Sequence, residues 1–336
     1  MEPTRKCSHT GFWIGLSLLA VFLLFSVVLN FGLLVSLVVS HGSGDGHGGR
    51  GGEDEFPRLS EHWSYGRGHV KAVCISLEGP IFRERGDGFF PSRFDKVEEI
   101  LREIRAAQAD HDVRALILDV ESPGGAITPS DEIYRALLNF KKSDSHRKVV
   151  VFMRDVAASG AYYVSMAGDW LIAEPTAIVG SIGVIIETLN WKTLSEKIGI
   201  TDVTIKSGAN KDLLNPFHDV PPEQRALVQA LIDNMQERFV GIVATGRKLD
   251  LATVKPLADG RIFTADNALQ LKLIDELGYW DQAVSATRKL LGERQLRVVR
   301  YEQPKDFLSL FGEMRAPKLF DPVSAQAPRL MFLWKP

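Results

Sequence analysis

Residues 157–163 read Ala-Ala-Ser-Gly-Ala-Tyr-Tyr, and they follow the apolar run Val149–Met153. The run predicts a buried strand, and the small residues around Ser159 predict a tight junction between that strand and a helix. A serine beside a glycine at such a junction can be an exposed nucleophile, because the start of the helix offers N–H groups to a developing oxyanion. The same pattern is typical of a serine that only caps a helix, so this stretch leaves both interpretations open.

Strands and helices alternate on both sides of this stretch, which predicts an α/β body. The expected strands are residues 70–77, 113–120, 148–153, 170–173, 178–186 and 203–205, and the expected helices are residues 92–110, 129–141, 191–198, 222–247, 251–257 and 264–271. With 336 residues, of which 45% are hydrophobic and 24% are charged, the chain is long enough for one large domain or two small ones.

The charge and the cysteines exclude several classes of function. A net charge of −2 gives no electrostatic footprint for nucleic acid, so we expect no nucleic-acid partner. The two cysteines, Cys7 and Cys74, lie before an apolar segment and inside an expected strand, which argues against a disulfide and against a cysteine metal site. We expect no metal and no cofactor, and we expect Cys74 to be a small buried apolar residue.

Residues 11–40 contain no charged residue and are dominated by Leu, Val and Phe. A bilayer crossing needs about 20 apolar residues, whereas a cleaved signal peptide has an apolar region of about 7–15. We therefore expect an uncleaved transmembrane anchor over residues 11–40, in contact with the lipid bilayer through residues 12–40; a buried core helix is the alternative. Arg5 and Lys6, in the N-terminal segment 1–10, predict a cytoplasmic N-terminus and a body on the other side.

Composition divides the rest of the chain into three parts. Residues 41–68 begin with seven glycines in twelve residues, which predicts a flexible linker. The α/β body covers residues 69–292, and a C-terminal extension covers residues 293–336. Its tail is rich in proline and ends in the apolar residues 330–334. Such a tail is either disordered or packed on a groove of its own chain, on a neighbouring subunit or on the membrane; we expect it to be partly disordered.

Two further motifs carry chemistry. Ser122-Pro123-Gly124-Gly125 follows an expected strand, and its glycines allow backbone N–H groups to point at a ligand. The polar loop 206–212 reads Lys-Ser-Gly-Ala-Asn-Lys-Asp.

A catalytic serine needs a base. His218 is the only histidine in a loop near these motifs, and a lysine can serve when burial keeps it neutral. Taken singly, the motifs are also compatible with a plain turn and a solvated lysine.

In combination these motifs resemble the signal peptide peptidase A family. The resemblance rests on residues 122–125, 158–163, 180–184 and 206–212, and on residues 259–264 followed by 273–278. It extends over roughly residues 70–291 and implies a Clp/crotonase-like α/β spiral of repeated ββα units. It also implies a serine endopeptidase that works through an acyl-enzyme, with Ser159 as nucleophile and Lys211 as general base.

The resemblance assigns further roles by position. Gly125 and Gly160 would donate N–H groups to the oxyanion, Gly124 would shape the turn, and Ser181 would orient the lysine. Asp212 must point away from that lysine, because a paired carboxylate would keep it charged. Members of the family form homo-oligomers and cut hydrophobic peptides, including remnant signal peptides, so the resemblance implies a single-pass protein of the bacterial cytoplasmic membrane with an extracytoplasmic catalytic domain.

Two other functions stay open at this point. Crotonase-type acyl-CoA hydratases and isomerases share the implied fold and use glycine-rich oxyanion loops, although they commonly use carboxylates as acid and base. A non-catalytic membrane scaffold could use the same groove to bind peptides. A serine-directed activity probe separates them, because only a peptidase would be labelled at Ser159.

Overall fold

The computed structural model describes residues 10–42, 55, 57–83, 95–302 and 330–334. The chain divides into two compact units, residues 1–54 and residues 55–336. In the first unit, helix α1 (Thr10–Gly42) has exposed apolar side chains such as Phe22 and Phe25. Among the residues whose side chains the structure describes, no helix has both the length and the apolarity that a membrane crossing requires.

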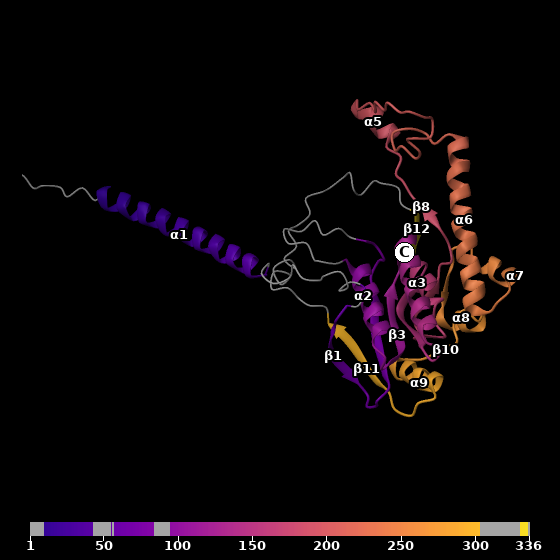
Figure 1. The fold of residues 1–336 in the computed structure, drawn as a ribbon. Coiled ribbons are helices and arrows are strands. Elements are labelled where there is room, and N and C mark those ends of the chain that lie inside the picture. Colours follow the sequence, from indigo (N-terminus) through magenta and orange to yellow (C-terminus); the bar gives the residue numbers. More distant parts are fainter. Residues whose placement is uncertain (1–9, 43–54, 56, 84–94, 303–329, 335–336) are drawn as a thin grey trace, which may run out of the picture. The chain divides into compact units, whose positions relative to one another are not determined.

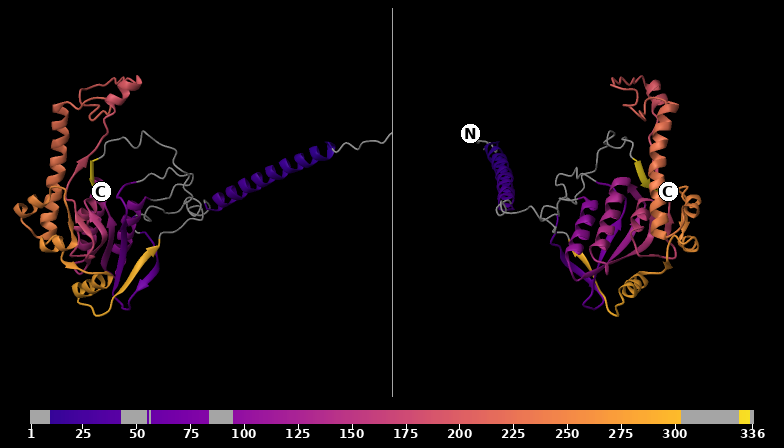
Figure 2. Two further views of the ribbon diagram at one scale, coloured as in Figure 1. Left: turned by 180° about the vertical axis from the view of Figure 1, so that it is seen from behind. Right: turned by 45° about the vertical axis from the view of Figure 1, so that its right-hand side comes forward.

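The second unit is built on a twisted sheet whose central strands are parallel (Figures 1 and 2). Its strands run in the order β1-β11-β2-β3-β5-β6-β10, and β7 and β9 extend it beside the end of β5. Their bounds are β1 Ser60–Tyr65, β2 Lys71–Glu78, β3 Val113–Ser122, β5 Lys148–Ala158, β6 Trp170–Ala173, β7 Ile178–Gly180, β9 Ile262–Thr264, β10 Glu276–Leu277 and β11 Arg297–Glu302. The α/β class predicted from the sequence is confirmed.

Helices cover both faces of this sheet because its central strands are apolar on both faces. Along β2, Val73 and Ile75 pack into the core formed with α2, α3, α4 and α6, whereas Ala72 and Cys74 face the side covered by α9. The helical segments are α2 Lys96–Ala109, α3 Ile127–Ser143, α4 Gly160–Ser165, α5 Lys192–Ile198, α6 Pro222–Arg247, α7 Leu251–Val254, η1 Lys255–Leu257, α8 Ala265–Gln270 and α9 Trp280–Leu291. Cys74 is buried, as predicted, and burial raises the pKa of its thiol to about 12.

A second, smaller sheet lies beside the ends of the central strands. It consists of β4 (Gly124–Ala126), β12 (Leu330–Leu333) and β8 (Ile185–Ile186), with β12 antiparallel to both neighbours (Figure 1). The expected strand over residues 178–186 is thus two strands. The first pairs with β5 in the main sheet and the second pairs with the C-terminal strand β12.

Some segments differ from what the sequence predicts. Strand β1 lies within residues 41–68, where a linker is expected, and pairs with β11 from the expected C-terminal extension. Pairing with β2 joins β11 to the main sheet, so both segments are partly built into the body. Residues 203–205 form no strand. Residues 43–54 and 303–329, which hold the glycine-rich part of the expected linker and most of the expected tail, lie outside the described residues.

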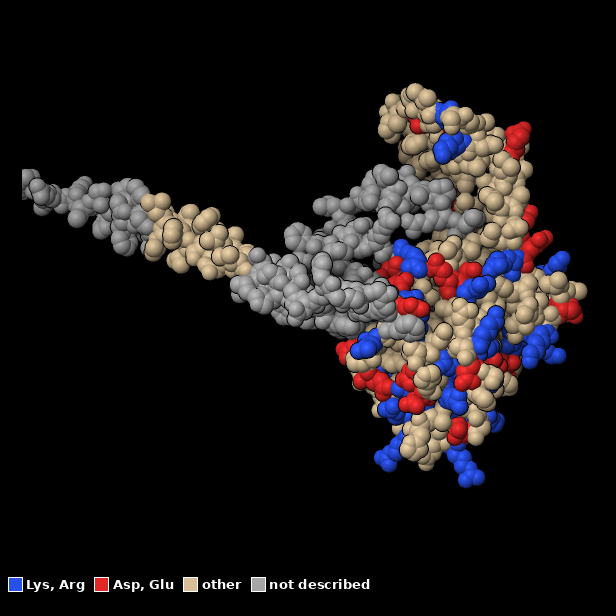
Figure 3. Space-filling model, in the orientation of Figure 1, with Lys and Arg blue, Asp and Glu red and all other residues tan. Residues whose placement is uncertain are grey.

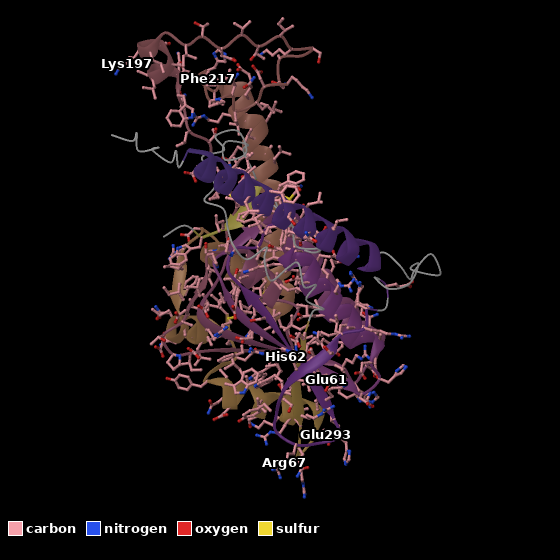
Figure 4. All side chains as sticks on the ribbon, turned by 90° about the vertical axis from the view of Figure 1, so that its left-hand side faces the viewer. Glu61, His62, Arg67, Lys197, Phe217 and Glu293 are labelled. Carbon is pink, nitrogen blue, oxygen red and sulfur yellow. The ribbon has the colours of Figure 1, made fainter. Side chains whose placement is uncertain are left out.

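Residues 187–231 project from the body and are called the arm below. The arm consists of α5, the loop that follows it and the first part of α6, and Figure 4 shows Lys197 and Phe217 on it, far from Glu61 and Arg67 at the other end of the unit. Its backbone is held by local bonds such as Trp191 N–H to the Pro216 carbonyl at 2.6 Å. Fewer charged side chains appear on the visible face of the arm than on that of the body (Figure 3).

Helix α4 is tied to the opposite side of the core by one buried hydrogen bond. The Tyr162 hydroxyl is fully buried and donates to the carbonyl of Leu273, at 2.7 Å. Burial also raises the pKa of Tyr162, so the phenol remains a donor at neutral pH. The bond holds the helix that follows Ser159 against the loop between α8 and β10.

Replacing Tyr162 by Phe should lower the free energy of unfolding by about 1–3 kcal/mol, because the Leu273 carbonyl would stay buried without its donor. Urea unfolding followed by circular dichroism measures the change. The control is Tyr279→Phe, since Tyr279 is 59% exposed. Equal stability of the two variants would contradict this role for the bond.

Candidate active site

Ser159 stands at the end of β5 in a backbone conformation that few non-glycine residues adopt. Its φ is 55° and its ψ is −117°, and its N–H donates to the carbonyl of Gly180 at 2.7 Å. Such strain persists only where the surroundings enforce it, and it is typical of nucleophiles at a sharp strand-to-helix turn. Ser159 is therefore not an ordinary helix N-cap: its backbone conformation differs from that of a typical cap, and its side chain makes no capping bond.

The hydroxyl of Ser159 is buried and makes no hydrogen bond to the described residues. The residue is 1% exposed, and its Oγ has no hydrogen-bond partner among the described residues. A buried hydroxyl without a partner loses the stabilisation that most buried polar groups have. Such a group calls for a functional explanation, and a reacting partner supplied from outside is one.

The turn between β3 and β4 approaches Ser159 closely. Gly124 has a φ of 92°, and a Cβ on it would lie 2.5 Å from the Gly160 nitrogen and 2.3 Å from the carbonyl oxygen of Phe332. No side chain fits there, so glycine is required both for the conformation and for the close approach. The Ser122 Oγ accepts a hydrogen bond from Gly124 N–H at 3.1 Å and fixes the turn.

Gly125 and Gly160 lie close together in a tightly packed part of the site. A Cβ on Gly160 would come within 3.1 Å of the Gly125 nitrogen and 2.6 Å of the Ser130 Oγ. The Gly125 nitrogen therefore lies close to Gly160, the residue after Ser159. Backbone N–H groups near a serine at a strand end are candidates for stabilising an oxyanion.

Ser181 belongs to the same cluster. It follows Gly180, whose carbonyl accepts the Ser159 N–H, and it has a φ of 49° and is 6% exposed. Its own N–H donates to the carbonyl of Arg261 at 2.8 Å, which ties the end of β7 to the segment before β9. The structure thus brings together Ser159, Gly124, Gly125, Gly160 and Ser181.

The two candidate bases are not part of this cluster. Lys211 lies exposed on the arm, and the Ser159 Oγ has no partner, so the two side chains are not bonded within the described chain. His218 also lies on the arm, where its Nε2 is 3.1 Å from Asp202.

Asp212, the residue after Lys211, binds the other lysine of the loop. Lys206 Nζ lies 2.7 and 2.8 Å from its two carboxylate oxygens, and this bond lowers the pKa of Asp212. Among the described residues Lys211 forms no ion pair. The expectation that Asp212 turns away from Lys211 is therefore met, and Lys206 is the reason.

Comparison with known proteins assigns the chain to a family. The sequence profile of peptidase family S49 matches residues 141–294. "Putative signal peptide peptidase SppA" of Enterococcus faecium is 35% identical over 237 residues, which cover 70% of this chain and 68% of that protein. The chain belongs to peptidase family S49.

More distant relatives agree with this family. "Protease 4" of Haemophilus influenzae is 31% identical over 247 residues, 72% of this chain and 38% of that protein. "Serine protease SPPA, chloroplastic" of Arabidopsis thaliana is 29% identical over 230 residues, 68% of this chain and 34% of that protein. The S49 chain is thus a serine endopeptidase, and not an acyl-CoA hydratase or a binding scaffold.

The structure also shows site residues of this S49 chain that the sequence does not single out. Phe332 is fully buried, and its ring centroid lies 5.0 Å from that of Tyr163 and 4.7 Å from that of Phe239. The apolar end of the tail was a signal for this packing, because five apolar residues in a row at a terminus either pack on something or stay exposed. The sequence does not indicate which surface they pack on.

The substitution Gly160→Ala should lower kcat/KM about 100-fold or more, because the added methyl group would intrude between the Gly125 nitrogen and the acceptor space. Hydrolysis of a fluorogenic apolar peptide measures the effect, and circular dichroism checks the fold. The control is Gly241→Ala, since a Cβ there meets nothing within 4 Å. Full activity of the Gly160→Ala protein would remove Gly160 from the oxyanion site.

Proposed function

We propose that this S49 protein is a membrane-anchored endopeptidase that cleaves apolar peptides, such as remnant signal peptides, with Ser159 as nucleophile and Lys211 as general base. The observation that carries the proposal is Ser159 itself, a strained and buried residue whose hydroxyl has no partner among the described residues and which stands next to the closely packed Gly124, Gly125 and Gly160. The Enterococcus relative is named a putative signal peptide peptidase, which supports the substrate class.

The chemistry follows from these groups. Lys211, when neutral, takes the hydroxyl proton as the Ser159 Oγ attacks the peptide carbonyl. The N–H groups of Gly125 and Gly160 stabilise the oxyanion of the tetrahedral intermediate. The intermediate collapses to an acyl-enzyme, and the departing amine receives the proton from the lysine. Water then attacks the ester, with the same lysine as base, and releases the second product.

We propose further that Lys211 acts on the serine of a neighbouring copy in a homo-oligomer. The lysine stands on the projecting arm, away from the serine of its own chain. The arm also exposes large apolar side chains: Val203 is 82% exposed and Ile205 is 98% exposed, and Leu189, Ile198 and Ile200 are each more than half exposed. Apolar side chains gathered on one segment favour a protein contact, and a second copy packed there would desolvate the lysine.

The architecture supports a Clp/crotonase-type fold for the body. Strands β2, β3, β5 and β6 are parallel and neighbouring, and a small second sheet lies at their ends. Glycine-rich turns that follow parallel strands suit the binding of a substrate carbonyl, because their backbone N–H groups are free to point at a ligand. Residues 122–125 and 158–160 occupy that place here.

The anchor is proposed on the sequence of the first unit. Residues 11–40 carry no charge, and side chains from Leu18 to Leu33 are largely exposed, including Leu24 at 71%. Apolar side chains on all sides of a helix suit a lipid environment. Arg5 and Lys6 before the helix support a cytoplasmic N-terminus and an extracytoplasmic peptidase.

Complementation tests the proposed base and its origin. Ser159→Ala and Lys211→Ala should each be inactive, because one lacks the nucleophile and the other lacks the base. When the two variants are co-expressed in one complex, about a quarter of the unmodified activity should return, since a site needs an intact serine beside an intact lysine from another copy. Peptide hydrolysis per mole of chain measures the return.

Two controls accompany that measurement. Lys197→Ala removes another lysine of the arm and should retain activity. Size-exclusion chromatography with light scattering checks that each variant assembles. A mixture that stays inactive although it co-assembles would show that the base comes from the same chain, and an active Lys211→Ala protein would show that Lys211 is not the base.

Charges placed in the middle of α1 test the anchor. Leu23→Arg combined with Leu24→Glu should move the protein from the membrane pellet to the supernatant after alkaline carbonate extraction, because each charge is costly in the bilayer core. The matched change Leu23→Ile with Leu24→Ile should leave it in the pellet. Retention of the charged variant in the pellet would contradict an anchor at α1.

A further inference from the structure

A cavity of about 460 Å³ lies at the end of the body that is opposite the arm. The turn between β1 and β2 forms one side of this cavity, and α9 with the turn that leads into β11 forms the other. Figure 4 shows Arg67 of the first turn at this end, far from Lys197 on the arm. The turn precedes β2, whereas Ser159 follows β5, and the two strands belong to one parallel set. The cavity and the serine therefore lie at opposite edges of the sheet.

Backbone packing fixes the two turns of the cavity against each other. Gly66 has a φ of 78°, and a Cβ on it would lie 2.4 Å from the carbonyl oxygen of Leu296. A Cβ on Gly68 would lie 2.9 Å from the carbonyl carbon of Gln295. Neither position has room for a side chain, so glycine is required on both sides of Arg67. Because backbone segments in contact form its walls, the cavity exists before any ligand enters.

Three arginines line this cavity, and they are Arg67, Arg288 and Arg294. None of their guanidinium groups forms an ion pair or a hydrogen bond with the residues that the structure describes. Elsewhere in the body arginines are commonly paired with carboxylates, as Arg247 is with Asp275 at 2.7 Å. Like charges around one cavity repel one another, and an anion bound between them would replace this repulsion by attraction.

The described lining of the cavity includes one carboxylate, that of Asp281 in the first turn of α9. Its Oδ1 accepts a hydrogen bond from the Tyr65 hydroxyl at 2.8 Å, which fixes its orientation. Three arginines and one aspartate leave an excess of two positive charges on the lining side chains. The cavity is therefore suited to an anion that carries about two negative charges.

The charge and the donors of the cavity indicate a phosphate monoester. Such a group carries about −1.5 to −2 charges at neutral pH and three strong acceptor oxygens, and guanidinium groups bind phosphate oxygens in pairs. A carboxylate ligand has two oxygens and one charge, so it would leave part of the excess uncompensated. Val284 and Leu296 also line the cavity and offer apolar surface to the esterified group. The volume lies within the range of small-molecule sites, about 300–1,000 Å³.

We propose that this cavity binds a phosphate monoester through Arg67, Arg288 and Arg294. The ester is a soluble molecule or the headgroup of a lipid such as phosphatidic acid, because both present the same phosphate group to the arginines. The inference does not rest on the proposed peptidase function, since the cavity and Ser159 lie at opposite edges of the sheet.

Protection of the arginines from phenylglyoxal tests the site in the full-length protein, held in nanodiscs of phosphatidylcholine. Phenylglyoxal modifies guanidinium groups, and mass spectrometry of the peptides gives the rate at each arginine. A bound phosphate should slow the modification of Arg67 and Arg294 at least about fivefold, because it occupies their donors. Arg135 is the control within the same molecule, since it is exposed and lies on α3, outside the cavity.

Two forms of the phosphate group identify the source of the ligand. Glycerol 3-phosphate, added at constant ionic strength, is the soluble probe, and phosphatidic acid in the nanodisc is the lipid probe. Protection by glycerol 3-phosphate would show that a soluble ester is sufficient, whereas protection by phosphatidic acid alone would assign the site to a lipid headgroup. Protection by neither probe would overturn the proposal, and so would equal slowing at Arg135.

Two variants distinguish a built site from general electrostatic screening. Arg67→Ala should reduce the protection of Arg294 to less than about twofold, because the phosphate loses one of its paired donors. Lys289→Ala removes a cation from the same turn of α9 that does not line the cavity, and it should leave the protection unchanged. Circular dichroism checks the fold of both proteins. Full protection of Arg294 in the Arg67→Ala protein would show that the arginines do not share a ligand.

Discussion

The backbone conformation of Ser159 depends on the pairing of β5, which is bonded first to β6 and then to β7. The first half of β5 pairs with β6 from Val150 to Met153, and its end pairs with β7 from Val156 to Ala158. The switch brings the Gly180 carbonyl to the Ser159 N–H and holds the serine at positive φ. The glycine turn after β3 then meets the serine because neighbouring parallel strands end at the same edge of a sheet.

This geometry explains what the sequence could predict. Apolar runs of four to eight residues are local signals, so the central strands and the helices around them follow from the chain itself. Parallel strands place their ends together, so the motifs at residues 122–125 and 159–160 could be expected to meet. The positive φ of Ser159 could not be predicted, because it depends on β7, which follows about twenty residues later and is tied there by β9.

The features that the sequence could not place depend on contacts between distant segments. Strand β12 pairs with β4 across about two hundred residues, and no periodic pattern in four apolar residues specifies a partner. The same holds for β11, which joins the sheet between β1 and β2. Long segments separate such strands in the sequence, so many strand pairings are possible, and only packing in the folded protein selects one of them.

The proposed nucleophile and the proposed base differ in burial within one chain. Ser159 is buried, whereas Lys211 lies exposed on the arm. Burial by another molecule is the change that makes such a lysine a base. Under the proposed mechanism, a single chain carries an incomplete site, and a neighbouring copy that covers the arm would complete it. Such a requirement would confine proteolysis to assembled protein.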